Sequence, residues 1–213
     1  MVEIFEFGVA DAERYADLLA KTVSAVANDD LAGAADALQP IAGEIWMGKL
    51  TSAGRRVNGG SAAGARLRDE LLRAQVFIRD GFRCTYCGVR AVPRSILVAV
   101  SDLFPEAVQY DIHYRRGKIH PVFWALAPEA DHIFAHSRGG PNTLDNLTTL
   151  HAGCNTRKSD SLAADLPHVE LSPALHRWDG LVSGYASLIA AGAGTARPAY
   201  HREWSGRYAR LMA

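Results

Sequence analysis

The chain has 213 residues and a mass of 23.0 kDa, which fits one medium-sized domain or a small domain with extensions. Hydrophobic residues make up 48% of it, as in ordinary globular proteins, and the formal net charge is zero. No apolar run approaches the ~20 residues of a membrane span. The first residues are acidic where a secretory signal has a basic flank, so we expect a cytoplasmic protein that does not enter membranes.

The charges are unevenly distributed along the chain. Residues 1–50 hold three Lys or Arg against nine Asp or Glu, a balance of −6. Residues 51–120 hold twelve against six, a balance of +6. A basic middle region suggests one positive face of the kind that binds a phosphate backbone. On charge alone, however, an ordinary solvated surface is the preferred interpretation.

The N-terminal region is predicted to be helical. Residues 2–8 alternate apolar and acidic and form either a short strand or a loose arm, whereas residues 10–27 have apolar residues at helical spacing. The run from Asn28 to Asp30 offers an N-cap for a second helix over residues 31–38. Residues 41–50 are predicted to form a third, short helical piece.

The middle of the chain begins with a Gly- and Ser-rich stretch, residues 51–66, which is typical of a linker or a mobile loop. A helical pattern resumes over residues 66–79, and residues 93–104 are a second helical candidate. Residues 107–120 are aromatic and charged and give no clear pattern. A small β element is expected around residues 130–134.

Three further helical segments are expected toward the C-terminus. Residues 159–164 should continue a helix that ends before Pro167, and residues 173–191 are a helical candidate interrupted by glycines. Residues 197–212 are predicted to form a closing helix. The fold class expected from the whole pattern is therefore α+β and mainly helical.

The three cysteines fall into a pattern that is typical of a zinc site. Cys84 and Cys87 form a CxxC, and His151 and Cys154 repeat the same spacing after 63 intervening residues. An odd number of cysteines fits a disulfide framework poorly, whereas three thiolates and one imidazole make a tetrahedral structural zinc site. Such a site would staple two distant segments together. The alternative is a set of buried cysteines beside a surface histidine.

The segment that contains the second pair carries several further motifs in order. They are Asp131-His132-Ile133, the turn from Ser137 to Gly140, Asp145-Asn146-Leu147, and Cys154-Asn155 followed by Lys158. Together with the upstream CxxC, this pattern resembles the HNH endonuclease family over about residues 79–160. It departs from the family at His151, where many members have cysteine, at Ala135, where proline is frequent, and in a long insertion at residues 92–127.

Phosphodiester hydrolysis needs an activated water and a cation that stabilises the leaving oxygen. A neutral imidazole accepts a proton near pH 7, so His132 is the candidate general base. The resemblance implies that Asp131 reaches a catalytic metal, and the amide of Asn155 would be a second oxygen ligand. Such a ligand set suits Mg²⁺ or Mn²⁺. The resemblance also implies a ββα-metal fold, in which Asn146 contributes to the catalytic site by bracing its loop.

Three basic residues near the motif are candidates for nucleic-acid contacts: Arg138, Arg157 and Lys158. Lys158 lies about one turn beyond Asn155, where it would face the same side and meet a phosphate. A solvated turn is an equally good interpretation of Arg138. His136 is either a second metal ligand, a phosphate contact or an exposed loop histidine.

Two further histidines and three tryptophans are expected to be structural. His113 and His120 lie in the insertion, and we favour packing over substrate contact for both. The tryptophans at 124, 178 and 204 are expected to pack in the core rather than to stack on bases.

These expectations divide the chain into three regions. Residues 1–65 form an N-terminal helical region with a linker, residues 66–165 an HNH nuclease core with the insertion, and residues 166–213 a C-terminal helical extension. The leading hypothesis is a metal-dependent DNA endonuclease, with RNA as an alternative substrate. The competing hypotheses are a zinc-stapled nucleic-acid-binding module without cleavage activity, and a structural or interaction protein.

Overall fold

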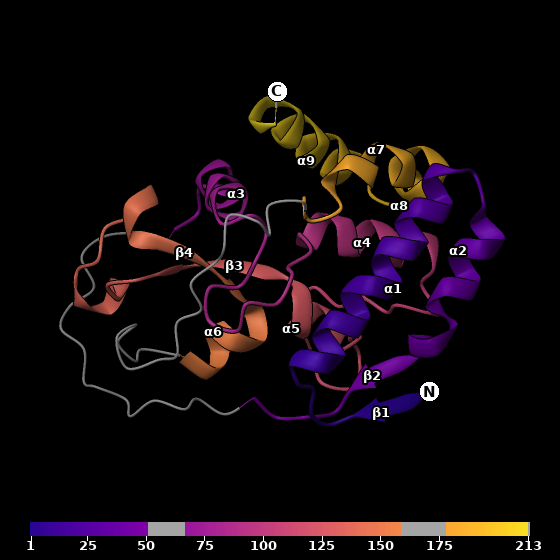
Figure 1. The fold of residues 1–213 in the computed structure, drawn as a ribbon, viewed down its shortest axis with the longest axis horizontal. Coiled ribbons are helices and arrows are strands. Elements are labelled where there is room, and N and C mark those ends of the chain that lie inside the picture. Colours follow the sequence, from indigo (N-terminus) through magenta and orange to yellow (C-terminus); the bar gives the residue numbers. More distant parts are fainter. Residues whose placement is uncertain (51–66, 159–177, 213) are drawn as a thin grey trace.

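The computed structural model describes residues 1–50, 67–158 and 178–212, and this part of the chain is mainly helical α+β with two small sheets (Figure 1). The predicted linker at 51–66 and the helix expected at 159–164 lie outside the described residues. The elements follow in the order β1 Val2–Ile4, α1 Val9–Ala27, α2 Leu31–Leu38, β2 Glu44–Trp46, α3 Glu70–Arg79, α4 Arg94–Leu103, α5 Val122–Leu126, β3 Pro128–His132, β4 Leu147–His151, α6 Ala152–Lys158, α7 Tyr185–Leu188, α8 Gly194–Ala196 and α9 Pro198–Leu211.

The N-terminal helices form as their sequence predicts. α1 buries a face that includes Tyr15, Leu19 and Val23, which confirms the amphipathic pattern. α2 begins at its expected cap, because the Gly33 amide donates a 2.8 Å hydrogen bond to the Asp30 carboxylate. The arm before α1 is a short strand, β1.

The short helix predicted for residues 41–50 is wrong. A single 3₁₀ turn ends at Ile41, Gly43 adopts a positive φ of 70°, and the chain then extends as β2. β2 pairs in parallel with β1, with Val2 opposite Glu44 and Ile4 opposite Trp46. The partner strand lies some 40 positions away, so local periodicity carries no trace of this pairing.

The largest hydrophobic cluster unites the N-terminal region, the insertion and the C-terminal region. α4, which confirms the helix expected at 93–104, is buried at every position from Ser95 to Ser101 and packs against α7 and α9 (Figure 1). The tryptophans at 124, 178 and 204 are partly buried and pack against the same cluster, as predicted. The insertion therefore supplies the centre of the core.

α9, which confirms the predicted closing helix, is attached to α4 and α7 by a buried polar chain. His201 donates a 2.8 Å hydrogen bond to the Asp102 carboxylate, and the Tyr185 hydroxyl donates one of 2.8 Å to the other ring nitrogen. The helix expected at 173–191 is described from residue 178 and is broken into short pieces, with Gly192 at a φ of 132°. The two hydrogen bonds of His201, to Asp102 and Tyr185, fix the position of α9.

β3 and β4 form an antiparallel hairpin, which confirms the β element expected around residues 130–134. α3 lies against the hairpin and begins at Glu70, later than predicted, because the Asp69 carboxylate accepts hydrogen bonds from the amides of Leu71 and Leu72. β4 runs directly into α6. Across the described residues, no helix has both the length and the apolar character needed to span a membrane.

His120 makes a pH-dependent contribution to stability. Its ring is fully buried, with Nε2 donating to the Ile41 carbonyl at 2.9 Å and Nδ1 accepting from the Val122 amide at 3.1 Å. Burial lowers the pKa of His120 from 6.5 to about 4. Between these values the unfolded chain binds the proton and the folded chain does not, so stability falls as pH decreases.

We predict that the free energy of unfolding loses about 3 kcal/mol through His120 as pH falls from 6.5 to 4, at about 1.4 kcal/mol per pKa unit. Urea unfolding of wild type and His120→Gln across this range measures the effect. The difference in free energy of unfolding between wild type and His120→Gln should shrink toward pH 4. His113→Gln, at an exposed position, is the matched control. A constant difference at all pH values would contradict the prediction.

Candidate active site and metal centre

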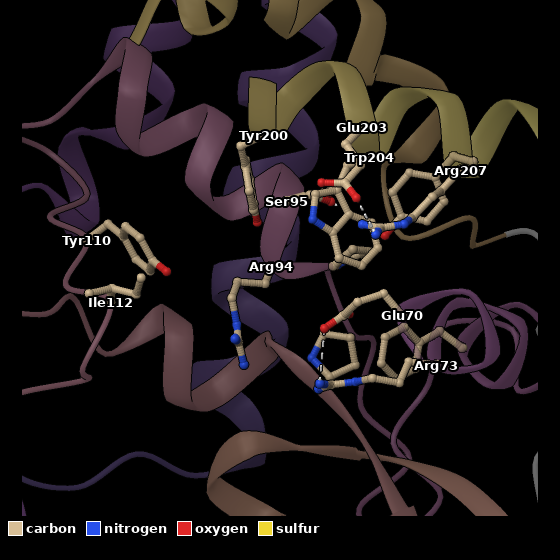
Figure 2. Close-up of a pocket in the computed structure, with 14 residues that line it drawn as sticks. Glu70, Arg73, Arg94, Ser95, Tyr110, Ile112, Tyr200, Glu203, Trp204 and Arg207 are labelled. Carbon is tan, nitrogen blue, oxygen red and sulfur yellow. Dashed lines mark hydrogen bonds and ion pairs between the residues drawn. The ribbon is translucent and has the colours of Figure 1, made fainter. Parts of the chain in front are cut away.

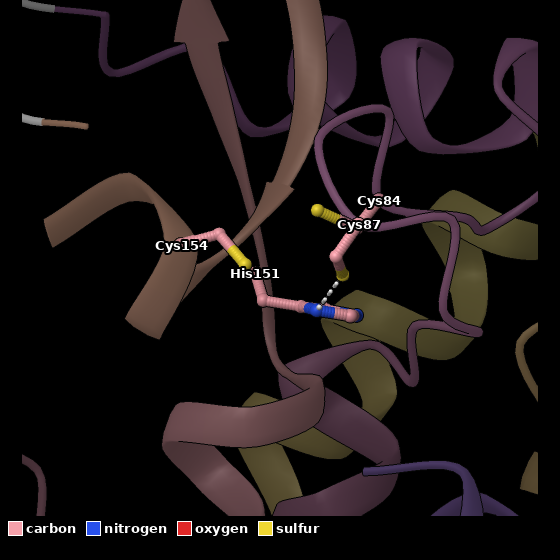
Figure 3. Close-up of side chains that lie close together, drawn as sticks. All are labelled: Cys84, Cys87, His151 and Cys154. Atoms are coloured by element: carbon pink, nitrogen blue, oxygen red, sulfur yellow. Dashed lines mark hydrogen bonds between the residues drawn. The ribbon is translucent and has the colours of Figure 1, made fainter. Parts of the chain in front are cut away.

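Four side chains that were predicted to bind zinc converge on one point (Figure 3). The sulfur atoms of Cys84, Cys87 and Cys154 and a ring nitrogen of His151 all lie within 4.8 Å of one another. A tetrahedral zinc ion with Zn–S bonds of ~2.3 Å separates its ligands by about 3.8 Å. The donor set and its spacing therefore fit a metal such as zinc.

Three structural elements deliver these ligands. The CxxC turn is closed by a 2.8 Å hydrogen bond from the Gly88 amide to the Cys84 carbonyl. The turn docks onto β4, because the Thr85 amide donates to the Thr149 carbonyl at 2.9 Å. His151 ends β4 and Cys154 lies in α6, so the cluster joins the CxxC turn, the hairpin and the helix that follows.

The cluster is electrostatically suited to a cation. His151 donates through Nε2 to the Arg90 carbonyl at 3.2 Å, which leaves Nδ1 directed toward Cys87 Sγ at 3.5 Å. Burial works against thiolate formation, but hydrogen bonds from the other two thiols lower the pKa of Cys84 well below its usual value. Burial likewise disfavours the imidazolium, yet the neighbouring thiolate charge raises the pKa of His151 to about 10. The cluster thus pairs a thiolate with an imidazolium, and a bound metal would displace the protons that these ligands share.

The motif loop between β3 and β4 is folded around Asn146. Its Nδ2 donates to the carbonyls of Phe134 and Pro141, at 3.1 and 3.0 Å, and its Oδ1 accepts from the Phe134 amide at 2.9 Å. Gly140 packs against the same part of the loop. A Cβ at this position would lie 1.8 Å from the Phe134 carbonyl oxygen, so the close packing requires glycine. The Asn146 side chain is fully engaged in the loop.

His132 ends β3 and is held by the same loop. Its Nε2 lies 2.8 Å from Asn142 Oδ1, which is an acceptor, so Nε2 carries the proton and the Nδ1 lone pair is left available. The ring of His136 is 5.2 Å from that of His132, and its buried Nε2 has no hydrogen-bond partner among the described residues. Of the two ring nitrogens of His132, Nδ1 is therefore the one that can accept a proton.

Asp131 and Lys158 form an ion pair between β3 and α6. The Lys158 ammonium lies 2.5 Å from Asp131 Oδ2, and the two side chains are 4% and 17% exposed. The same ammonium donates to the His132 carbonyl at 3.3 Å. Sequence reasoning placed Lys158 against a phosphate, whereas here the side chain points inward onto the candidate metal ligand.

Asn155 lies in the middle of α6 and lines a recess of about 290 Å³. Glu129, two residues before Asp131 on β3, lines the same recess. Asn155 makes no side-chain hydrogen bond within the described part of the chain. Apart from the cysteine cluster, the described residues contain no other converging group of three His, Cys, Asp or Glu.

The other two basic candidates differ in their surroundings. The Arg138 side chain has no hydrogen bond or ion pair with any residue that the structure describes. Arg157 instead places its guanidinium 5.2 Å above the ring of Phe7, in the arm before α1. Arg138 is therefore the more available of the two for a phosphate.

Several supporting residues escaped the sequence analysis. Arg79 donates to the carbonyls of Leu144 and Leu147, at 2.6 and 2.7 Å, and Asp80 accepts from the Thr149 amide at 2.8 Å. Both residues attach the end of α3 to the hairpin. The only sequence signal for these two residues was a charged pair at the end of a predicted helix, which is too common a feature to be informative without the fold.

Comparison with known proteins supports the resemblance inferred from the motifs. The model of the family described as HNH endonuclease matches residues 120–161, the stretch that contains β3, the motif loop, β4 and α6. No curated protein and no solved structure matched the chain.

We predict that the purified chain carries one tightly bound zinc per molecule, because the four ligands form a closed set. Cys84→Ser should lose most of this metal and unfold at lower urea concentration, since metal binding to such sites is coupled to folding. Elemental analysis and urea unfolding measure both effects. His136→Ala, which lies outside the cluster, is the control. Full zinc content in Cys84→Ser would contradict this assignment.

We also predict energetic coupling between Asp131 and Lys158. Lys158→Met should destabilise the protein, because it leaves a largely buried carboxylate without its partner. Adding Asp131→Asn should recover part of the loss, with a coupling energy of roughly 1–3 kcal/mol in a double-mutant cycle. Urea unfolding of the four proteins measures this energy. Strict additivity would show that the two side chains do not interact in solution.

Proposed function

We propose that the chain is a metal-dependent endonuclease of the HNH type that hydrolyses phosphodiester bonds in DNA, with RNA as the alternative substrate. The observation that carries the proposal is the arrangement within the segment matched by the family model. There Asp131 and His132 end one strand of a hairpin, and Asn155 lies on the helix that follows its other strand. We infer that this hairpin and helix form a ββα-metal core.

The residues around Asp131 fit a hard divalent cation such as Mg²⁺ or Mn²⁺. Asp131 would supply a carboxylate oxygen and Asn155 an amide oxygen, which are the ligand types that these ions prefer. When bound, the cation would polarise the scissile phosphate and stabilise charge on the leaving oxygen. Lys158 pairs with the Asp131 carboxylate, which keeps that buried charge compensated.

His132 is suited to activate the attacking water. Because its Nε2–H donates to Asn142, its Nδ1 lone pair is the site that takes the proton from water. Asn142 holds the ring in this tautomer, and the Asn146 hydrogen bonds keep the loop that carries Asn142 in place. In this proposal Asn142 and Asn146 are positioning residues, and His132 is the catalytic residue.

The cysteine cluster would hold a structural zinc ion where the CxxC turn, the end of β4 and α6 meet. A four-ligand Cys₃His set leaves no open position for substrate. Arg138 would contact a phosphate of the substrate backbone and thereby fix its register. We further propose a reducing, cytoplasmic setting, in which the three free cysteines remain available to the metal.

The second candidate function is a zinc-stapled nucleic-acid-binding module without cleavage activity. The ion pair between Lys158 and Asp131 favours it, since that ammonium competes with any cation for the same carboxylate. The two functions share the zinc site and Arg138. They differ in whether Mg²⁺ or Mn²⁺ produces strand cleavage.

Plasmid cleavage tests the proposal. Zinc-loaded wild type with Mg²⁺ or Mn²⁺ should nick or linearise supercoiled DNA. His132→Ala should lower the cleavage rate by about 10²- to 10⁴-fold, which is the usual contribution of a general base. Lys21→Ala, at an exposed position of α1 that does not line the recess of Asn155, should cleave like wild type.

Equal activity of wild type and His132→Ala would place the reaction elsewhere or in a contaminant. DNA binding by a zinc-loaded wild type that cleaves nothing with either metal would favour the binding module. Both proteins need measured zinc contents, so that loss of the fold is not mistaken for loss of the base.

A further inference from the structure

A recess outside the motif lies where α3, α4, β3 and α9 meet, and we call it the α9 recess. Its volume is about 310 Å³, which is within the range of small-ligand sites. Its walls are arginines and aromatic rings, chiefly Arg73, Arg94, Tyr110, Tyr200, Trp204 and Arg207. Figure 2 shows Tyr110 and Tyr200 pointing inward toward Arg94 from opposite elements.

The arginines of the α9 recess are already neutralised. Arg73 and Arg94 each form an ion pair with one oxygen of the Glu129 carboxylate, and Arg73 also pairs with Glu70 at 3.6 Å. Arg207 pairs with Glu203 at 2.6 Å, one turn earlier on α9. The recess therefore offers little uncompensated positive charge, and an isolated phosphate would gain little there. A neutral ligand with hydrogen-bonding groups fits the walls better.

The aromatic rings form a ridge along α9. Tyr200, Trp204 and Tyr208 recur at four-residue spacing, and the Trp204 ring lies 6.5 Å from Tyr200 and 5.7 Å from Tyr208. Arg207 lies over the Trp204 ring, 4.7 Å from its centroid, so the guanidinium plane covers one face of that ring. The hydroxyls of Tyr110 and Tyr200 make no hydrogen bond with any described residue. Flat faces beside unpaired hydroxyls match a planar ring with polar edges.

The α9 recess borders the recess that contains Asn155, a candidate active-site residue. The recess that contains Asn155 shares two of its lining residues, Arg94 and Ile112, with the α9 recess. Pro128 also lines the α9 recess and begins the strand that ends at His132. Four residues of strand span ~13 Å, or about four steps of ~3.4 Å along a nucleic-acid strand.

We propose that the α9 recess holds one nucleobase that has turned out of the substrate strand close to the phosphate that is cut. The base stacks on the Trp204 ridge and its polar edge meets the hydroxyls of Tyr110 and Tyr200. Stacking of this kind is the usual way in which proteins hold an unpaired base. The inference rests on the proposed nuclease function, because it assigns the ligand as part of that enzyme's substrate.

The test compares two short single strands of equal length and equal phosphate number, under conditions without Mg²⁺ or Mn²⁺. One strand is abasic throughout, and the other carries bases in its central positions. Fluorescence anisotropy with zinc-loaded, full-length wild type should show roughly five- to a hundredfold tighter binding of the strand with bases. Trp204→Ala should remove this preference and leave binding of the abasic strand unchanged.

Arg202→Ala is the matched control, because Arg202 is exposed on the same helix and does not line the recess. It should keep the preference for bases. If Trp204→Ala fails to fold by circular dichroism, the pair Tyr110→Phe and Tyr200→Phe replaces it, since loss of the hydroxyls alone should weaken the preference. Equal binding of both strands by wild type, or a preference that survives these variants unchanged, overturns the inference.

The outcome is separable from that of the proposed function. A wild type that cleaves plasmid but binds both strands equally would refute the α9 recess as a base site and leave the nuclease intact. A wild type that prefers bases through Trp204 yet cleaves nothing would support the recess and refute the nuclease.

Finally, a duplex with one mismatched pair should bind more tightly than a fully paired one, because a mismatched base costs less to turn out.

Discussion

The meeting of three thiols and one imidazole within 4.8 Å is the constraint on which the candidate site depends. Two of these ligands come from a turn that precedes the insertion, and two come from the end of β4 and from α6. A metal ion bound there would fix α6 relative to the hairpin. The position of α6 in turn decides where Asn155 and Lys158 lie, and Lys158 pairs with Asp131.

Within this frame, the site is held by polar contacts from residues that do no chemistry. Arg79 and Asp80 attach α3 to β4, and Asn146 closes the motif loop. Glu129, between Arg73 and Arg94, ties β3 to α3 and α4. Each contact crosses between segments that are far apart in sequence. The hairpin is therefore supported on several sides before any substrate is present.

The cysteine and histidine cluster and the HNH motif could be predicted from the sequence, because their residues occur at short, fixed spacings. The helices over residues 10–27 and 93–104 were readable for the same reason, since their periodicity is local. The strand β2 was not, because its partner is the N-terminal arm and its pairing leaves no local pattern. The ion pair of Lys158 with Asp131 was also missed, because the motif gives the order of residues and not which way a side chain turns.

The insertion shows a second limit of sequence reasoning. Its composition gave no clear pattern over residues 107–120, yet this part of the chain supplies Tyr110 to the wall of the α9 recess and the fully buried His120 to the core. The recess is assembled from α3, the insertion, β3 and α9, so no single stretch of sequence identifies it. Its neutralised arginines became visible only with the fold.

The measurement that tests the central claim most directly is cleavage of DNA in water enriched in ¹⁸O. Hydrolysis by an activated water at phosphorus predicts one ¹⁸O atom in the 5′-phosphate of the product, detected by mass spectrometry, with a 3′-hydroxyl on the other fragment. The label should appear with zinc-loaded wild type and Mg²⁺ or Mn²⁺. Cleavage products without the label, or no products from a zinc-loaded protein that binds the same DNA, would contradict the account.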